Sequence, residues 1–75
     1  MKNAEFSLSN KIRTLRFMAG EMTQKELADL VGVTRQTVNA IESNKYSPSL
    51  EVAFKISLVF KAPITDVFFY DAPSE

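Results

Sequence analysis

Apolar residues recur along much of this 75-residue chain at intervals of three or four, the spacing of amphipathic helices. The clearest case runs from Gln24 to Ser43, where two short periodic segments flank a turn at Gly32. The apolar faces of the two segments comprise Leu27, Ala28, Leu30 and Val31 in the first and Val38 and Ile41 in the second. This pattern predicts two helices joined by a tight turn, as in a DNA-binding helix-turn-helix.

Residues that favour helix ends flank both segments of this motif. Gly32 follows the first apolar run, where glycine readily takes the left-handed conformation that ends a helix. Thr34 is placed to cap the second helix, and Thr23, with Glu26 three residues later, to form a capping box for the first. Small Ala28 lies where the helices must approach closely. These features predict the helix boundaries independently of the apolar pattern.

The segment before the motif predicts a helix that is capped by Ser9 and reaches about Ala19. Its expected buried face follows the same spacing and comprises Ile12, Leu15, Phe17 and Met18. We expect Lys11 and Arg13 on the solvated side of this helix.

The segment after the motif predicts two more helices. Asn44 can take a left-handed conformation after the motif, and a fourth helix is expected over about Ser49–Phe60. This stretch has too many apolar residues for one narrow face, so part of it should be central to the core. Thr65 is placed to cap a short last helix. Residues 1–75 are therefore predicted to form a single all-α domain of five helices, with the helix-turn-helix at residues 24–43.

The second helix of the motif presents a polar stripe on the side opposite its apolar residues. A rotation of about 100° per residue gathers five side chains there, Arg35, Gln36, Asn39, Ala40 and Ser43. Arg35 can pair with guanine O6 and N7, and Gln36 or Asn39 with adenine N6 and N7. Ala40 can pack on a thymine methyl group. We expect these four residues to contact bases, because the N-terminal part of such a helix enters the major groove.

A second set of side chains borders this stripe and suits the DNA backbone. Gln24 begins the first motif helix, where unpaired amides and the helix dipole favour a phosphate. Thr34, Thr37 and Ser43 offer hydroxyl groups, and Lys45 offers a positive charge after the second helix. Each could also be an ordinary surface residue. Their convergence on one face favours phosphate contacts, which position a protein without reading the sequence.

The composition of the chain excludes several kinds of functional site. The chain has no cysteine and no histidine, which excludes disulfides, thiolate or imidazole catalysis and the usual zinc ligands. Neither a metal nor a cofactor is expected. No acid–base constellation or glycine-rich phosphate loop is present, so no enzymatic activity is expected. The sequence also has no membrane-spanning run and no signal-peptide pattern, which predicts a cytoplasmic protein without a membrane partner.

The charge distribution limits how strongly the protein can attract DNA. Nine basic and nine acidic residues give a net charge of zero. Residues 1–37 hold six basic and four acidic residues, whereas residues 38–75 hold three and five. The positive half is the one with most of the helix-turn-helix, but the bias is mild. Affinity for DNA must therefore come from a few well-placed contacts rather than from a strong general field.

Two further groups of residues are predicted to serve structure and assembly. Glu42 lies at the edge of the buried side of its helix, where a carboxylate needs a partner, and Arg16 is the candidate for a structural ion pair. Phe68, Phe69 and Tyr70 form a compact aromatic cluster near the end of the chain. They could be a core residue with two surface neighbours. A subunit interface is favoured, because so small a monomer has little room to bury all three.

Residues 10–69 resemble the Cro/C1-type (XRE) family of bacterial and phage repressors. The pieces that carry the resemblance are Thr23-Gln24, Leu27-Ala28, Gly32-Val33-Thr34-Arg35-Gln36, Ile41-Glu42 and Tyr46-Ser47-Pro48-Ser49-Leu50. More narrowly, the RQT-x-x-x-IE-x-NKY-x-PSL run and the aromatic tail resemble short, single-domain dimeric repressors typified by the cytolysin-operon repressor.

This resemblance implies a lambda-repressor-like domain of five helices, extended by a small antiparallel sheet from the two chain ends. The implied strands are Phe6-Ser7-Leu8 and Phe69-Tyr70-Asp71. The residues themselves leave the N-terminal segment open between a strand and a frayed terminus. The resemblance also implies a two-fold homodimer with the C-terminal region in its interface and the recognition helices in successive major grooves.

One turn departs from the family pattern. Members usually have Gly-x-Thr-Gln before the second helix, whereas residues 20–24 here contain one extra residue. Counting back from Gln24 would place Phe17, rather than Arg16, at the position of the family's first-helix arginine. The pairing of Arg16 with Glu42 therefore depends on a turn that absorbs the extra residue.

These observations together predict a sequence-specific DNA-binding transcriptional regulator that acts as a repressor. It would bind double-stranded DNA at a pseudo-palindromic operator, as a homodimer, through the recognition helix at residues 35–43. Two alternatives remain open. One is the DNA-binding antitoxin of a toxin–antitoxin pair, whose aromatic tail would contact a partner protein. The other is a protein-interaction module that never touches nucleic acid.

Overall fold

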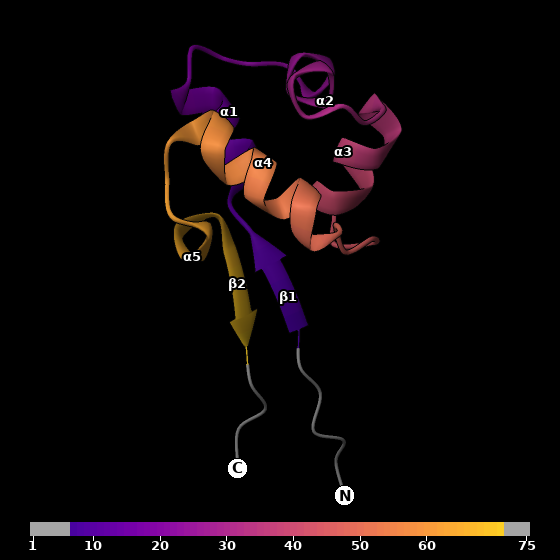
Figure 1. Cartoon of the computed structure of the whole chain (residues 1–75), viewed down its shortest axis with the longest axis vertical. Coiled ribbons are helices and arrows are strands. Elements are labelled where there is room, and N and C mark those ends of the chain that lie inside the picture. The colour runs from indigo at the N-terminus through magenta and orange to yellow at the C-terminus, as the bar shows by residue number, and fades with distance from the viewer. Residues whose placement is uncertain (1–6, 72–75) are drawn as a thin grey trace, which may run out of the picture.

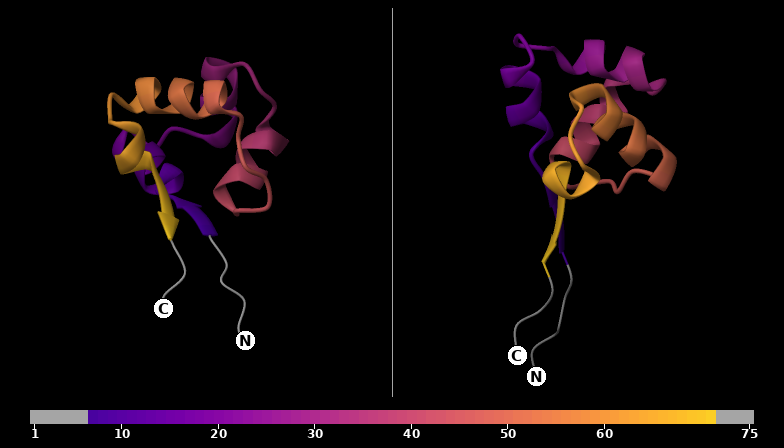
Figure 2. Two further views of the ribbon diagram at one scale, coloured as in Figure 1. Left: turned by 60° about the horizontal axis from the view of Figure 1, so that its bottom comes forward. Right: turned by 60° about the vertical axis from the view of Figure 1, so that its left-hand side comes forward.

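The computed structural model describes residues 7–71, which form five helices and a two-stranded antiparallel sheet (Figure 1). The elements in chain order are β1 (Ser7–Asn10), α1 (Ile12–Met18), α2 (Gln24–Val31), α3 (Arg35–Glu42), α4 (Leu50–Phe60), α5 (Ile64–Val67) and β2 (Phe68–Asp71). The helices gather at one end, and the sheet projects from them (Figure 2). The predicted five-helix domain with a small terminal sheet is thus confirmed. No helix within residues 7–71 is long and apolar enough to cross a membrane.

The core is built from aliphatic side chains contributed by all five helices and centred on the helix-turn-helix. Its eight buried members are Ile12, Leu27, Ala28, Val31, Val38, Ile41, Ile56 and Val67. Five of these belong to α2 and α3, so the packing of those two helices against each other is part of the main core. Each large side chain buried in this way contributes about 1.5–3 kcal/mol.

Three residues expected on buried faces lie on the surface instead. Phe17 and Met18 are largely exposed, because α1 is only seven residues long and Arg16 completes its inward face beside Ile12. Leu30 is also largely exposed, since the burial of its neighbours on α2 turns it toward solvent. The helical spacing was correct in both helices, but it did not show which side chains would border the core.

The predicted capping residues and the predicted turn of the helix-turn-helix are confirmed. The Thr23 hydroxyl accepts a hydrogen bond from the Glu26 amide at 3.0 Å, and the Glu26 carboxylate accepts one from the Thr23 amide at 2.8 Å. Thr34 accepts from the Thr37 amide at 3.1 Å. Gly32 ends α2 with a φ of +79°, in the left-handed region. Local residue chemistry therefore sets the ends of α2 and the start of α3.

Two other predicted caps are wrong. Ser9 lies within β1, and α1 begins after Lys11; the side-chain oxygen of Asn10 accepts a hydrogen bond from the Ile12 amide at 3.1 Å. Thr65 lies inside α5, and the cap residue is Pro63, whose ring carries no hydrogen-bonding group. In the first case the strand that displaces the predicted cap pairs with residues far along the chain, which local sequence rules do not consider.

The sheet joins the two ends of the described chain. Its antiparallel register pairs Ser7 with Asp71, Leu8 with Tyr70, Ser9 with Phe69 and Asn10 with Phe68. One further backbone hydrogen bond, from the Lys11 amide to the Val67 carbonyl at 2.9 Å, continues this contact into the helical part. The implied strand at residues 6–8 is thus found at Ser7–Asn10, and Phe6 lies outside the described residues. The implied partner strand begins one residue earlier, at Phe68.

The capping box at Thr23 gives a direct test of this account of stability. Replacing Thr23 with Ala should lower the free energy of unfolding by about 1 kcal/mol, because the Glu26 amide loses its acceptor. Thr65→Ala is the matched control, and it should leave stability unchanged or slightly higher, since alanine favours a helix interior. Urea denaturation followed by circular dichroism measures both. Equal losses in the two variants would contradict the assigned caps.

Candidate nucleic-acid interface

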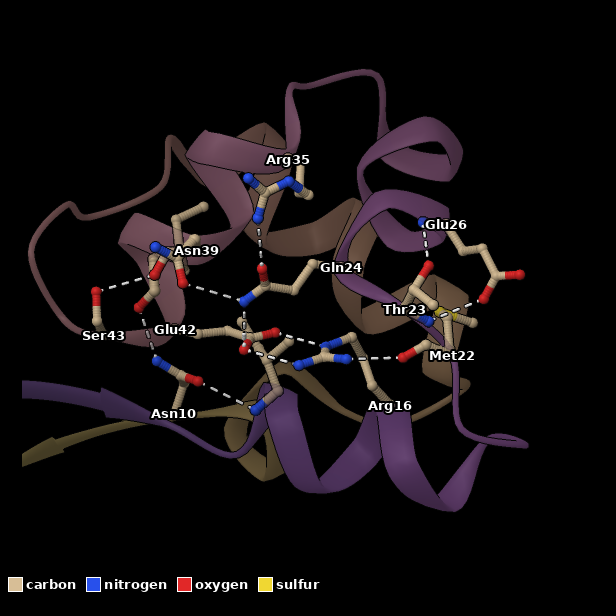
Figure 3. A network of polar contacts seen from close by, with 12 residues as sticks. Asn10, Arg16, Met22, Thr23, Gln24, Glu26, Arg35, Asn39, Glu42 and Ser43 are labelled. Atoms are coloured by element: carbon tan, nitrogen blue, oxygen red, sulfur yellow. Dashed lines mark hydrogen bonds and ion pairs between the residues drawn. The ribbon is translucent and has the colours of Figure 1, made fainter.

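The outer face of α3 brings together the side chains predicted to read bases. Arg35, Gln36 and Asn39 are exposed and Ala40 is partly exposed, while the apolar side of the helix is buried in the core. Figure 3 shows Gln24 reaching from the start of α2 toward Arg35, which lies above it in this view, and Asn39, which lies to its left. The polar stripe therefore includes residues of both helices of the motif.

A bidentate ion pair between Arg16 and Glu42 lies directly beneath this stripe (Figure 3). Arg16 Nε donates to Oε2 of Glu42 at 2.7 Å, and Nη2 donates to Oε1 at 3.0 Å. The third nitrogen, Nη1, donates to the Met22 carbonyl at 2.7 Å. The two side chains are only 14% and 9% exposed. The pair thus fastens α1 to the C-terminal end of α3 and to the turn before α2.

The extra residue between α1 and α2 is absorbed within the turn. Gly20 and Glu21 are both left-handed, with φ of +85° and +60°. The Glu21 amide bonds to the Phe17 carbonyl at 3.0 Å, and the Met22 amide to the Arg16 carbonyl at 2.9 Å. The turn therefore folds back on the end of α1. Arg16, rather than Phe17, keeps the inward position.

Gln24 connects the ion pair to the stripe on α3. Its Nε2 donates to Glu42 Oε1 and to Asn39 Oδ1, each at 3.2 Å, while its Oε1 faces Arg35 Nη1 at 3.5 Å. The orientation of the amide follows from its neighbours, because its nitrogen meets two acceptors and its oxygen meets a guanidinium. Gln24 was predicted to contact a phosphate. That contact remains a prediction, and in the structure the Gln24 side chain also contacts those of Arg35 and Asn39.

The hydroxyl groups at the rim of the stripe differ in what they can offer. Thr34 and Thr37 share a hydrogen bond between their hydroxyls at 3.0 Å, so one hydroxyl hydrogen of the two remains to be donated. Ser43 directs its hydroxyl to the backbone carbonyls of Asn39 and Ala40, at 2.9 and 3.3 Å. In this orientation Ser43 has no hydrogen to donate to a phosphate.

The loop after α3 holds Lys45 beside the stripe. Asn44 takes the predicted left-handed conformation with a φ of +62°, and the Lys45 amide bonds to the Ala40 carbonyl at 2.9 Å. The side chain of Asn10 adds a contact from β1, because its Nδ2 donates to the Ile41 carbonyl at 3.0 Å and to Asn44 Oδ1 at 3.2 Å. Lys45 itself is exposed.

Arg13 was missed as a candidate by the sequence reasoning. It is exposed on α1, and it lines a surface hollow together with Arg16, Gln24, Asn39, Glu42 and Ser43. The available signal was its position three residues before Arg16, on the same side of the helix. α1 therefore contributes a second cation next to the polar stripe.

The three residues of the aromatic tail, Phe68, Phe69 and Tyr70, differ in how far they are buried. Phe68 is partly buried and packs against the core, and Phe69 is partly buried with the Lys11 ammonium 5.4 Å from its ring centre. Tyr70 is largely exposed. Only one of the three predicted interface residues therefore projects mainly into solvent in the single chain.

A helix-turn-helix family model matches residues 12–67, from the start of α1 to the end of α5. The chain belongs to the XRE-type helix-turn-helix family. A relative from Archaeoglobus fulgidus, named an HTH-type transcriptional regulator, is 48% identical over 64 residues, covering 85% of this chain and 90% of that protein. YgzD of Bacillus subtilis, an HTH-type transcriptional regulator, is 45% identical over 64 residues, covering 85% and 96%.

A solved structure shares the fold of this XRE-type protein. It was determined as a candidate DNA-binding protein of Bacteroides fragilis, and it superposes with a TM-score of 0.71 at 22% identity, covering 83% of this chain and 98% of its own. The chain is therefore a transcriptional regulator with a DNA-binding helix-turn-helix, formed by α2 and α3.

The ion pair of this XRE-type regulator can be tested by its effect on stability. Glu42→Gln should lower the free energy of unfolding by about 3 kcal/mol or more, because the Arg16 charge keeps its low exposure without a counter-charge. Asp29→Asn removes the same charge from the surface pair with Lys25, whose side chains are 69% (Lys25) and 66% (Asp29) exposed. That control should lose about 0.5 kcal/mol or less. Similar losses in urea denaturation would refute the assigned role.

Proposed function

We propose that this regulator is a cytoplasmic repressor that binds a pseudo-palindromic operator as a homodimer, with α3 in the major groove. A relative supports the repressing role. The repressor RstR of the Vibrio cholerae cryptic phage CTXphi is 36% identical over 59 residues, covering 79% of this chain and 52% of that protein. The observation that supports the DNA contact most strongly is the polar stripe on α3, held by Gln24 above the Arg16–Glu42 pair.

The hydrogen bonds of the stripe suggest which bases it reads. One nitrogen of the Arg35 guanidinium faces Gln24, which leaves its other donors for guanine O6 and N7. Asn39 has one lone pair of Oδ1 engaged by Gln24, so its Nδ2 is the group best placed to donate to a purine N7. Gln36 suits adenine and Ala40 suits a thymine methyl group.

The phosphate contacts of this proposal lie around the rim of the stripe. The amides at the start of α2 next to Gln24, the Thr34 and Thr37 hydroxyls and the Lys45 ammonium would bind the backbone. Arg13 on α1 joins this set because of its place in the same hollow. Ser43 would contribute once its hydroxyl turns away from the helix backbone.

The proposed homodimer is based on the way in which dimeric helix-turn-helix proteins place two helices on DNA. Two copies related by a two-fold axis would place their α3 helices in successive major grooves, with half-sites about one helical turn (~34 Å) apart. The partly buried Phe68 and Phe69 and the largely exposed Tyr70 remain candidates for the contact between copies.

Selection of bound sequences from a random pool of double-stranded DNA tests this function. The wild-type protein should enrich an inverted repeat with half-sites about one turn apart. Arg35→Ala should bind the selected site about 1–3 kcal/mol more weakly and tolerate any base at one position of each half-site. Gln36→Ala should behave in the same way at a neighbouring position.

Lys61→Ala is the matched control, because it removes one exposed positive charge at the far end of α4. This variant should keep both affinity and specificity. The proposed base contacts would be wrong if Arg35→Ala and Gln36→Ala selected the same site as the wild type with unchanged affinity. Failure of the wild type to enrich any sequence would refute specific DNA binding.

A further inference from the structure

The outer face of α4 carries a stripe of large apolar side chains that the helix-turn-helix does not use. Leu50, Phe54 and Leu58 are 70%, 50% and 75% exposed. They are spaced by four residues, so successive side chains lie about 40° apart and follow one line along the helix. Their exposure shows that the described part of the chain leaves this line of side chains largely uncovered.

This apolar surface extends sideways from α4 to the base of the sheet. A hollow next to the stripe is lined by Leu8, Pro48, Leu50, Ala53, Ile64 and Phe68. It leads from the stripe to Phe68, the first residue of the aromatic tail. Contiguous exposed apolar surface of this kind marks a site of protein–protein contact.

We propose that this face is the seam of the homodimer, in which α4 packs antiparallel against α4 of a second copy with Phe54 at the two-fold axis. The inference rests on the dimer of the proposed function and places its contact on the α4 stripe, defined as Leu50, Phe54 and Leu58. The aromatic tail then lies at the edge of the contact rather than at its centre.

The α4 stripe is complementary to itself. A two-fold contact requires the same surface on both copies, with residue i opposite j and j opposite i. Leu50 lies four residues before Phe54 and Leu58 lies four residues after it. Reversing one helix therefore places leucine opposite leucine at both ends and Phe54 opposite Phe54 in the middle.

The charges beside the stripe favour the antiparallel direction. Glu51 and Lys55 border the stripe on one side, where they form an exposed ion pair at 3.4 Å within the chain. In the antiparallel seam, Glu51 comes to lie about 3 Å along the helix axis from Lys55 of the second copy, on the same side. A parallel seam would place the two charges on opposite sides. Each dimer could therefore form two ion pairs between copies, around an apolar centre.

A first experiment measures the dissociation constant of the dimer by sedimentation. Phe54→Ser should raise it about ten-fold or more, because Phe54 fills the centre of the contact. Phe17→Ser is the matched control, since Phe17 is a comparably exposed phenylalanine (67%) on α1 and is not part of the α4 stripe. Circular dichroism of both variants checks that the fold is kept. An unchanged dissociation constant in Phe54→Ser would overturn the proposed seam.

A second experiment exchanges the charges and does not depend on removing apolar contacts. Glu51→Lys and Lys55→Glu should each weaken self-association several-fold, because like charges then face each other across the seam. An equimolar mixture of the two variants should form a heterodimer tighter than either homodimer, since every charge again meets its opposite. Native mass spectrometry distinguishes the three species. A mixture with no preference for the heterodimer would contradict the antiparallel contact.

These results separate the seam from the rest of the proposed function. A wild-type dimer that is insensitive to all of these changes would refute the α4 seam and leave the dimer in place. A wild type that stays monomeric at high concentration and on operator DNA would refute both. Base reading by Arg35 is tested separately by the DNA selection.

Discussion

The ion pair between Arg16 and Glu42 is the contact on which the rest of the interface depends. It joins α1, the turn before α2 and the end of α3 through three short hydrogen bonds with little exposure to water. Hydrogen bonds between the charged groups of a poorly exposed ion pair are strong only when their geometry is well defined. The pair therefore restricts how α3 can shift against α1. Gln24 carries that restriction outward to Arg35 and Asn39. The side chains proposed to contact DNA are therefore ordered by contacts on their inner side.

This arrangement also explains how a protein with no net charge can present a surface for DNA. Glu42 lies in α3, the helix proposed to enter the major groove, where an unpaired carboxylate would repel phosphates, and Arg16 neutralises it. Arg35 within the stripe and Arg13 and Lys45 next to it are then exposed cations. A small number of charges at fixed positions, together with ordered polar groups, favours specific contacts with DNA over a general electrostatic attraction to it.

Much of the fold could be predicted from the sequence, because short-range rules set the ends of α2 and the start of α3. The same rules failed at Ser9, where pairing with a distant strand took precedence. Periodicity predicted helices but did not reveal that the inward face of α1 includes Arg16 and leaves Phe17 outside. In the site, the residue types on α3 were foreseeable from spacing. The bonds of Gln24 were not, because they depend on how α2 and α3 pack against each other.

The most direct test of the account uses the chemistry of a single base atom. In the selected operator, the guanine assigned to Arg35 is replaced by 7-deazaguanine, which lacks the N7 acceptor but still pairs with cytosine. Binding isotherms of the wild type and Arg35→Ala are then compared on both DNAs. We predict that the replacement weakens wild-type binding by about 1 kcal/mol and has no further effect on Arg35→Ala. Equal losses in both proteins would show that Arg35 does not read that base.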